Sequence, residues 1–263
     1  MSNGHSGRQA ENGYSLLELL LAVSIFTVIS GAVFQLLNIA QKRFQTEGQI
    51  LGSFQEGRLA LDQIVHNFND SGFPARNQFS ITSPAVTSYA VSPVAWSPSY
   101  PTTSCAIGAC TSPGSFDVIF EEYNSTTSTV QWIRYELTGT TLYRGAIDKT
   151  TGDPVSTFNS STNVMFPYAT NVMNNASTSQ ITTINAAYPG TFPGGTPVPM
   201  FTYYCDTGST PTLCSSAGSY NTAQNIRDVE VTLIIETQQA DMQSGKLRLV
   251  TLNGRGHRVN PNQ

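Results

Sequence analysis

The sequence predicts an α+β protein in which a long amino-terminal helix packs on an antiparallel β-sheet domain with long loops. The first observation is an apolar segment, residues 16–39, followed by a helical pattern that reaches residue 70. The second is a set of strand-like segments that begins after residue 115. The third is that no helical crossover separates the late strands, which favours antiparallel pairing.

The apolar segment reads LLELLLAVSIFTVISGAVFQLLNI. As a helix it would be about 36 Å long, whereas about 20 apolar residues suffice to cross the hydrocarbon core of a bilayer. A buried helix in a soluble protein rarely lacks a polar face over such a length. Residues 16–39 are therefore predicted to form a membrane-spanning helix.

Glu18 is the only charged residue between Tyr14 and Gln41. A carboxylate in hydrocarbon is costly and marks a functional site that needs a partner. Its place near the start of the segment leaves a second interpretation open, in which Glu18 lies at the headgroup boundary.

The helical pattern continues beyond the apolar segment without a strong breaker. Apolar residues recur with spacings of 3, 4 and 7, which indicates an amphipathic helix. Glycine and proline in the string Ser71-Gly72-Phe73-Pro74 predict its end. A helix from Tyr14 to Asp70 would be about 85 Å long. The predicted stripe comprises Phe44, Leu51, Phe54, Leu61, Val65 and Phe68.

Strand patterns mark the carboxy-terminal part of the chain. Residues 116–120 form one predicted strand, and residues 130–137 and 141–144 form a hairpin around a Thr-Gly-Thr turn. Residues 229–235 alternate between apolar and other side chains, which indicates a half-buried strand. Its predicted partner is 246–252, with residues 237–245 as the connection.

The composition excludes some classes of function. Only 11% of the residues are charged and the net charge is −4, whereas typical soluble domains carry about 25% charged residues. This argues against nucleic acid as a partner, because phosphate binding needs clustered Lys and Arg. Residues 77–116 hold no charge at all, and residues 154–226 hold one, Asp206. Such segments are typical of turns, short strands and surface loops, and whether 77–115 and 154–220 are ordered stays open.

The four cysteines are predicted to form disulfides in an exported domain. Sequential pairing, Cys105 with Cys110 and Cys205 with Cys214, is preferred because each pair closes a small loop, although the sequence allows three pairings. Free thiols stay open, and a zinc site is disfavoured by the absence of CxxC spacing and nearby histidines.

No catalytic or cofactor motif stands out. The histidines, His5, His66 and His257, have no nucleophile motif around them, and no phosphate loop or dinucleotide fingerprint occurs. We therefore predict no catalytic residue, no cofactor and no metal. Residues 148–153 fit a turn better than a weak calcium loop. Tyr89, Trp96 and Tyr100 fit core packing better than an adhesive surface.

The string Gly13-Tyr14-Ser15-Leu16-Leu17-Glu18-Leu19-Leu20 resembles the type IV prepilin processing motif. The resemblance implies cleavage after Gly13 by a prepilin peptidase, N-methylation of Tyr14, and an assembly role for Glu18. In such filaments this carboxylate faces the terminal ammonium of an adjacent subunit. Tyr14 stands where the family more often has Phe, and the leader is less basic than most.

Further patches are similar to PilW-like minor pilins and to the related J-type minor pseudopilins of type II secretion. The resemblance implies a pilin-like fold with a cleaved leader (1–13), a transmembrane and filament-core half-helix (14–40), an amphipathic half-helix (41–72) and an exported β-rich head (73–263). The patches are residues 56–62, 71–73, 132–137, 142–144 and 226–233.

The resemblance also implies a function without catalysis. The leading expectation is a minor type IV pilin that acts in pilus assembly, priming or a tip complex. The alternatives are a type II secretion minor pseudopilin and a membrane-anchored surface adhesin or hydrolase. The implied partners are prepilin peptidase, other major and minor pilins, the inner-membrane assembly platform and, before assembly, membrane lipid. The implied location is the inner membrane with a periplasmic head, then the pilus at the cell surface.

Overall fold

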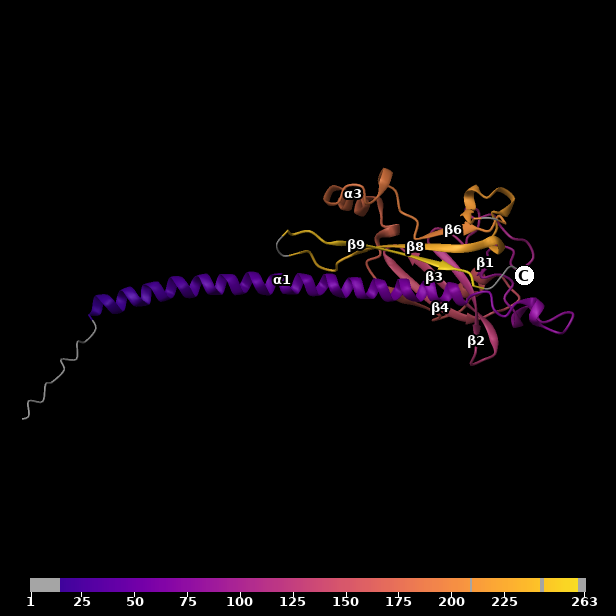
Figure 1. Ribbon diagram of the computed structural model, residues 1–263, viewed down its shortest axis with the longest axis horizontal. Helices are drawn as coiled ribbons and strands as arrows, with labels where there is room; N and C mark the ends of the chain where they lie inside the picture. The colour runs from indigo at the N-terminus through magenta and orange to yellow at the C-terminus, as the bar shows by residue number, and fades with distance from the viewer. Residues whose placement is uncertain (1–14, 209, 242–243, 260–263) are drawn as a thin grey trace, which may run out of the picture. The chain divides into compact units, whose positions relative to one another are not determined.

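A computed structural model describes residues 15–208, 210–241 and 244–259. Its longest element is helix α1, Leu16–Asp70 (Figure 1). The chain divides into two units, residues 1–48 and 49–263, so the second half of α1 belongs to the same unit as all the strands. The helix ends where the sequence predicts, and Gly72 follows with a positive φ of 82°, a conformation that glycine adopts without strain.

The first sheet has five antiparallel strands in the order β1-β2-β3-β4-β5. The predicted hairpin is confirmed as β3 and β4, which pair up to Thr138 and Thr141 around Gly139. The predicted strand at 116–120 is confirmed as β2. The strand bounds are β1 Val94–Ala95, β2 Asp117–Asn124, β3 Thr129–Thr138, β4 Thr141–Asp148 and β5 Met165–Ala169.

The second sheet has four antiparallel strands in the order β7-β6-β8-β9. The predicted late pair is confirmed as β8 and β9, although β9 begins three residues after Lys246 and extends to His257. The strands therefore form two sheets rather than one. The bounds are β6 Phe201–Cys205, β7 Thr212–Leu213, β8 Ile226–Glu236 and β9 Leu249–His257.

Short helices lie in the nearly uncharged segments. Helix α2, Pro154–Ser160, is capped by Asp153, and helix α3, Thr178–Ala187, begins with a capping box between Ser177 and Gln180. Local capping thus fixes order that composition alone left open. Single 3₁₀ turns occur at Arg76–Gln78, Val86–Ser88, Met173–Asn175, Pro193–Gly195, Cys214–Ser216, Gly218–Tyr220 and Ala223–Asn225.

The second half of α1 packs against both sheets. Phe68 contacts Phe120 of β2 at 5.6 Å between ring centroids, and on the other sheet the backbone of Gly256 in β9 passes so close to Phe68 that a Cβ would clash. The predicted stripe is therefore wrong at its start, because Phe44 and Leu51 are exposed. The buried residues of α1 are Gly57, Ala60, Leu61, Ile64, Asn67 and Phe68.

Candidate functional site

The first candidate site is the exposed apolar surface of α1 in the first unit. This helix is long and apolar enough to cross a membrane, with a mean hydropathy of 2.3 over its most apolar window, none of which is buried. Leu16 is 78% exposed and Phe34 72%. The hydroxyls of Ser24 and Thr27 donate to helix carbonyls at 2.7 Å, which removes the cost of placing them in hydrocarbon.

Glu18 lies in the first turn of α1. Its Oε2 accepts a hydrogen bond of 3.4 Å from the backbone nitrogen of Ser15. A carboxylate at this end is favoured by the partial positive charge of the helix amino terminus. Gly13 and Tyr14, the predicted processing residues, lie outside the described residues, five and four positions before Glu18.

The cysteines form the second candidate site. The structure pairs Cys105 with Cys110 and Cys205 with Cys214, with Cα–Cα distances of 5.6 and 4.8 Å. The first disulfide loop is held by Asn221, seven residues after Cys214, whose side chain accepts from the Ile107 nitrogen at 3.1 Å and donates to its oxygen at 3.4 Å. The sequence held no signal for this contact between distant loops.

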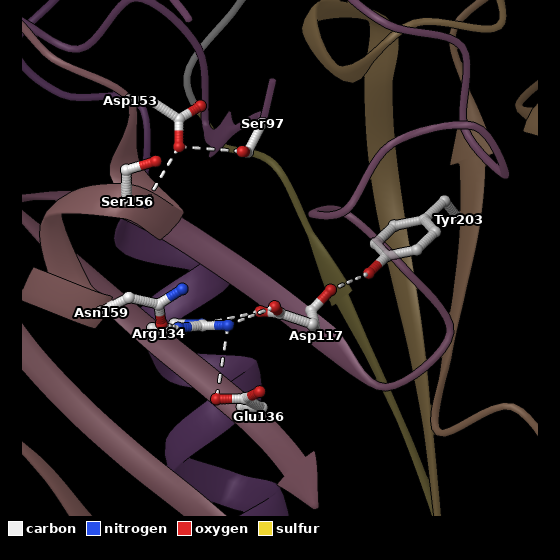
Figure 2. A network of polar contacts seen from close by, with 8 residues as sticks. All are labelled: Ser97, Asp117, Arg134, Glu136, Asp153, Ser156, Asn159 and Tyr203. Carbon is white, nitrogen blue, oxygen red and sulfur yellow. Dashed lines mark hydrogen bonds and ion pairs between the residues drawn. The ribbon is translucent and has the colours of Figure 1, made fainter. Parts of the chain in front are cut away.

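A network of polar contacts on the first sheet contains the groups that most resemble an active site (Figure 2). Arg134 on β3 donates to Asp117 at 2.8 and 3.2 Å and lies 3.3 Å from Glu136. Burial raises the pKa of Asp117 to about 6, against the opposing effect of Arg134. A further bond of 3.3 Å links Arg134 to Asn159 of α2. These contacts hold β2, β3 and α2 together. Asp117 stays paired with the guanidinium of Arg134, which is always positively charged.

Asp153 belongs to the same region and caps α2. Its Oδ1 accepts from the Ser156 nitrogen and from Ser97 Oγ, both at 2.9 Å (Figure 2). The calcium interpretation of residues 148–153 gains no support from this arrangement, because Asp153 serves the helix and Lys149 turns into the core. Among the described residues, no group of three or more His, Cys, Asp or Glu side chains could hold a metal ion.

A buried ion pair lies beneath the loop that precedes β2. The side chains of Glu121 and Lys149 are both fully buried, with 3.0 Å between Oε2 and Nζ. Lys149 also donates to the Tyr89 carbonyl at 2.6 Å, and Val91 donates its backbone N–H to Glu121 at 2.6 Å. Tyr100 donates its hydroxyl to the same carboxylate.

Burial has opposite effects on the two titratable donors around Glu121. It lowers the pKa of Lys149, and it raises the pKa of Tyr100 well above its usual value. Both residues stay hydrogen-bonded to Glu121 inside the core, and Trp96 and Tyr100 are buried. The adhesive interpretation of these two aromatics is therefore wrong. The sequence did not single out Glu121, and it included Lys149 only in the candidate calcium loop, residues 148–153.

The two histidines among the described residues each lie beside an aspartate. His66 lies 3.3 Å from Asp70 on the exposed side of α1, and His257 Nδ1 contacts Asp228. Asp228 also binds Arg255 at 2.6 Å. Among the described residues no hydroxyl or thiol bonds to either imidazole, so neither histidine is placed as a general base for a nucleophile.

The fold and these sites define a class of protein, a pilin-like α+β arrangement with an apolar helix at its amino terminus. Residues 8–34 match the family model for the prokaryotic N-terminal methylation motif. The chain thus carries a type IV pilin-like prepilin signal that runs directly into the exposed half of α1. The motif implies processing by a prepilin peptidase and assembly with other pilins. No curated protein and no solved structure matches the chain.

Proposed function

We propose that this protein is a minor type IV pilin of the PilW-like kind, a non-catalytic subunit of the complex that primes or tips the pilus. One observation carries the proposal. The methylation motif at residues 8–34 leads into a single helix whose first half exposes its apolar side chains and whose second half is built into a β-rich unit. That arrangement suits a membrane anchor that leaves the lipid during assembly and then packs against the helices of neighbouring subunits.

The proposed mechanism follows from the cost of exposing the apolar half of α1 to water. Prepilin peptidase cleaves after Gly13, and Tyr14 becomes the N-methylated terminus. Residues 14–40 hold the subunit in the inner membrane, with residues 73–263 in the periplasm. During assembly Glu18 pairs with the terminal ammonium of a neighbouring subunit, because opposite charges attract strongly where water is excluded. The assembled subunit then reaches the cell surface.

Mass spectrometry of the mature amino terminus tests the processing steps. We expect a chain that begins at Tyr14 and carries a methyl group on its amine. A chain that begins at Met1, or one cut after residue 40, would contradict the proposal.

A pair of variants tests the role of Glu18. Glu18→Ala should lower recovery of the subunit in sheared filaments by about tenfold or more, since an unpaired ammonium would remain in an apolar bundle. Its amount in the membrane fraction should not change. Glu47→Ala is the matched control, because Glu47 is an exposed carboxylate on the same helix. Equal incorporation of both variants would refute the docking role.

Gene deletions, rather than the amino terminus, distinguish a minor pilin from a type II secretion minor pseudopilin. The subunit should enter filaments in cells that lack the type II secretion platform and fail to do so in cells that lack the pilus platform. The reverse result would identify it as a minor pseudopilin.

A further inference from the structure

Glu121 and Lys149 bring a carboxyl group and an amine into contact inside the core. Both side chains are 0% exposed, and Lys149 Nζ lies 3.0 Å from Glu121 Oε2. The carboxyl carbon is one bond beyond that oxygen, so the amine lies close to the atom that a nucleophile attacks. The two residues are 28 positions apart, on β2 and directly after β4, with β3 between these strands in the sheet. A covalent bond between them would therefore tie together two strands that do not pair.

The two oxygens of the Glu121 carboxyl group have different neighbours. Oε1 accepts from the Tyr100 hydroxyl and, at 3.0 Å, from Trp132 Nε1. Oε2 accepts from Lys149 and, at 2.6 Å, from the backbone N–H of Val91. Attack on the carboxyl carbon places negative charge on the oxygen that stays, and two donors already point at Oε1, as in an oxyanion hole. Oε2, the oxygen beside the amine, is then the one that leaves.

The surroundings of the pair favour neutral groups over charged ones. Burial lowers the pKa of Lys149, which raises the share of the neutral amine, the form that acts as a nucleophile. Two buried charges each carry a desolvation cost, and an amide carries no charge. Lys149 Nζ also donates to the Tyr89 carbonyl at 2.6 Å, and the N–H of an amide can keep that bond. The hydrogen-bond partners of the nitrogen and of Oε1 therefore also suit an amide.

We propose that Lys149 and Glu121 condense to an intramolecular amide in the folded protein. A bond forms between Lys149 Nζ and the carboxyl carbon of Glu121, and the bond from that carbon to Oε2 breaks. Two of the three ammonium protons go to Oε2, which leaves as water, and the third stays on the amide nitrogen. The positive and negative charges cancel, and the step consumes no oxidant, reductant or cofactor. The ion pair described above is the reactant.

Folding makes this step possible, because it holds the two groups together and keeps bulk water out. Well-oriented groups within one molecule react as if one of them were present at about 10⁵ M or more. Both side chains are fully buried, so bulk water does not reach the amide to hydrolyse it. In the unfolded chain the two groups are separated and solvated, and the step should not occur. The dependence on folding gives the experiment its control.

Intact-mass spectrometry of the full-length, detergent-solubilised subunit tests the proposal without any substitution. During days in neutral buffer we expect the folded protein to lose one water molecule, about 18 Da. The same chain kept in urea should keep its mass. Tandem mass spectrometry after trypsin digestion should place the loss in a branched peptide that joins Glu121 to Lys149, uncut after Lys149. A folded subunit that keeps its full mass, or a loss that maps to other residues, would overturn the proposal.

Two variants test the roles of the amine and of the donors to Oε1. Lys149→Arg keeps the positive charge, but a guanidinium is not deprotonated in proteins, so this variant should keep its full mass. Tyr100→Phe removes one donor and should slow the loss of water about tenfold or more. Loss of water from the arginine variant, or an unchanged rate in the phenylalanine variant, would contradict these roles. The proposed function is tested in filaments, so either proposal can fail alone.

Discussion

The two halves of α1 share one helical conformation and have opposite surroundings. In the first half Leu16 and Phe26 are 78% and 70% exposed, whereas in the second half Ile64 and Phe68 are each 1% exposed. Isolated helices gain little stability in water, so the second half depends on its packing against the sheets. Among the described residues of its own unit, 15–48, the first half has no such cover, so it needs lipid or other helices.

This difference separates two kinds of residue on one helix. Side chains of the second half contribute to the free energy of unfolding of the β-rich unit, because they fill its core. Side chains of the first half contribute to insertion and assembly, because only an outside apolar environment covers them. Substitutions in the second half should therefore lower the stability of the β-rich unit, whereas substitutions in the first half should impair membrane insertion and assembly.

The largest expected loss of stability comes from the buried ion pair. Lys149→Met leaves Glu121 buried without its counter-charge and should lower the free energy of unfolding by about 3–5 kcal/mol. Urea unfolding in detergent, followed by tryptophan fluorescence, measures this, because both tryptophans, Trp96 and Trp132, lie in the core. Lys42→Met on the exposed half of α1 should leave the unfolding curve unchanged.

The double variant Lys149→Met with Glu121→Met sharpens this prediction. Replacing both members of a buried pair by apolar side chains costs far less than removing one. We expect the double variant to regain most of the lost stability. A single variant as stable as the unmodified protein would mean that the pair contributes nothing to the core.

A matched pair of phenylalanines compares the two halves of α1 directly. Phe68→Ala empties a site between the two sheets and should lower the free energy of unfolding by about 3–4 kcal/mol. Phe26→Ala removes the same side chain from the exposed half and should leave the tryptophan-monitored transition in place. Equal effects of the two substitutions would show that the halves of α1 are not energetically separate.

The sequence alone predicted those elements whose local residue pattern matches the environment that they have in the folded protein. The ends of α1, the hairpin around Gly139 and the β8–β9 pair were predicted because periodicity and turn residues specify them within a few positions. The stripe on α1 was partly wrong, since spacing alone cannot tell that Phe44 and Leu51 stay exposed. Helical periodicity shows that the apolar residues lie on one face of a helix, but it does not show what covers that face.

Contacts between distant segments lay beyond the sequence. Glu121 and Lys149 are 28 residues apart, and nothing near either one indicates a buried partner. Asn221 bonds to Ile107 in the first disulfide loop, 114 residues earlier in the chain. Helices α2 and α3 were missed because short helices depend on caps, such as Asp153 and Ser177, that also fit turns.

The smallest expected effect is a pH dependence confined to the β-rich unit. Burial raises the pKa of Asp117 to about 6, whereas an unfolded aspartate titrates near pH 4. The folded protein then holds the proton over a range in which the unfolded chain has released it. The contribution of Asp117 is fully present below about pH 4 and is lost as the pH rises through about 6, with a total change of about 3 kcal/mol.

Asp117→Asn isolates this contribution, because asparagine cannot ionise and its Oδ1 can still accept one of the two hydrogen bonds that Arg134 donates to Asp117. The difference in unfolding free energy between the unmodified protein and Asp117→Asn should change between pH 4 and pH 6 and stay constant from pH 7 to 8. Asp62→Asn, an exposed carboxylate on α1, is the control and should show no such step. If this difference in unfolding free energy does not change with pH, or if the contribution of Asp117 grows as the pH rises, then Arg134 lowers the pKa of Asp117 at least as much as burial raises it. The carboxylate would then be an ordinary ion-pair partner in the brace between β2 and β3.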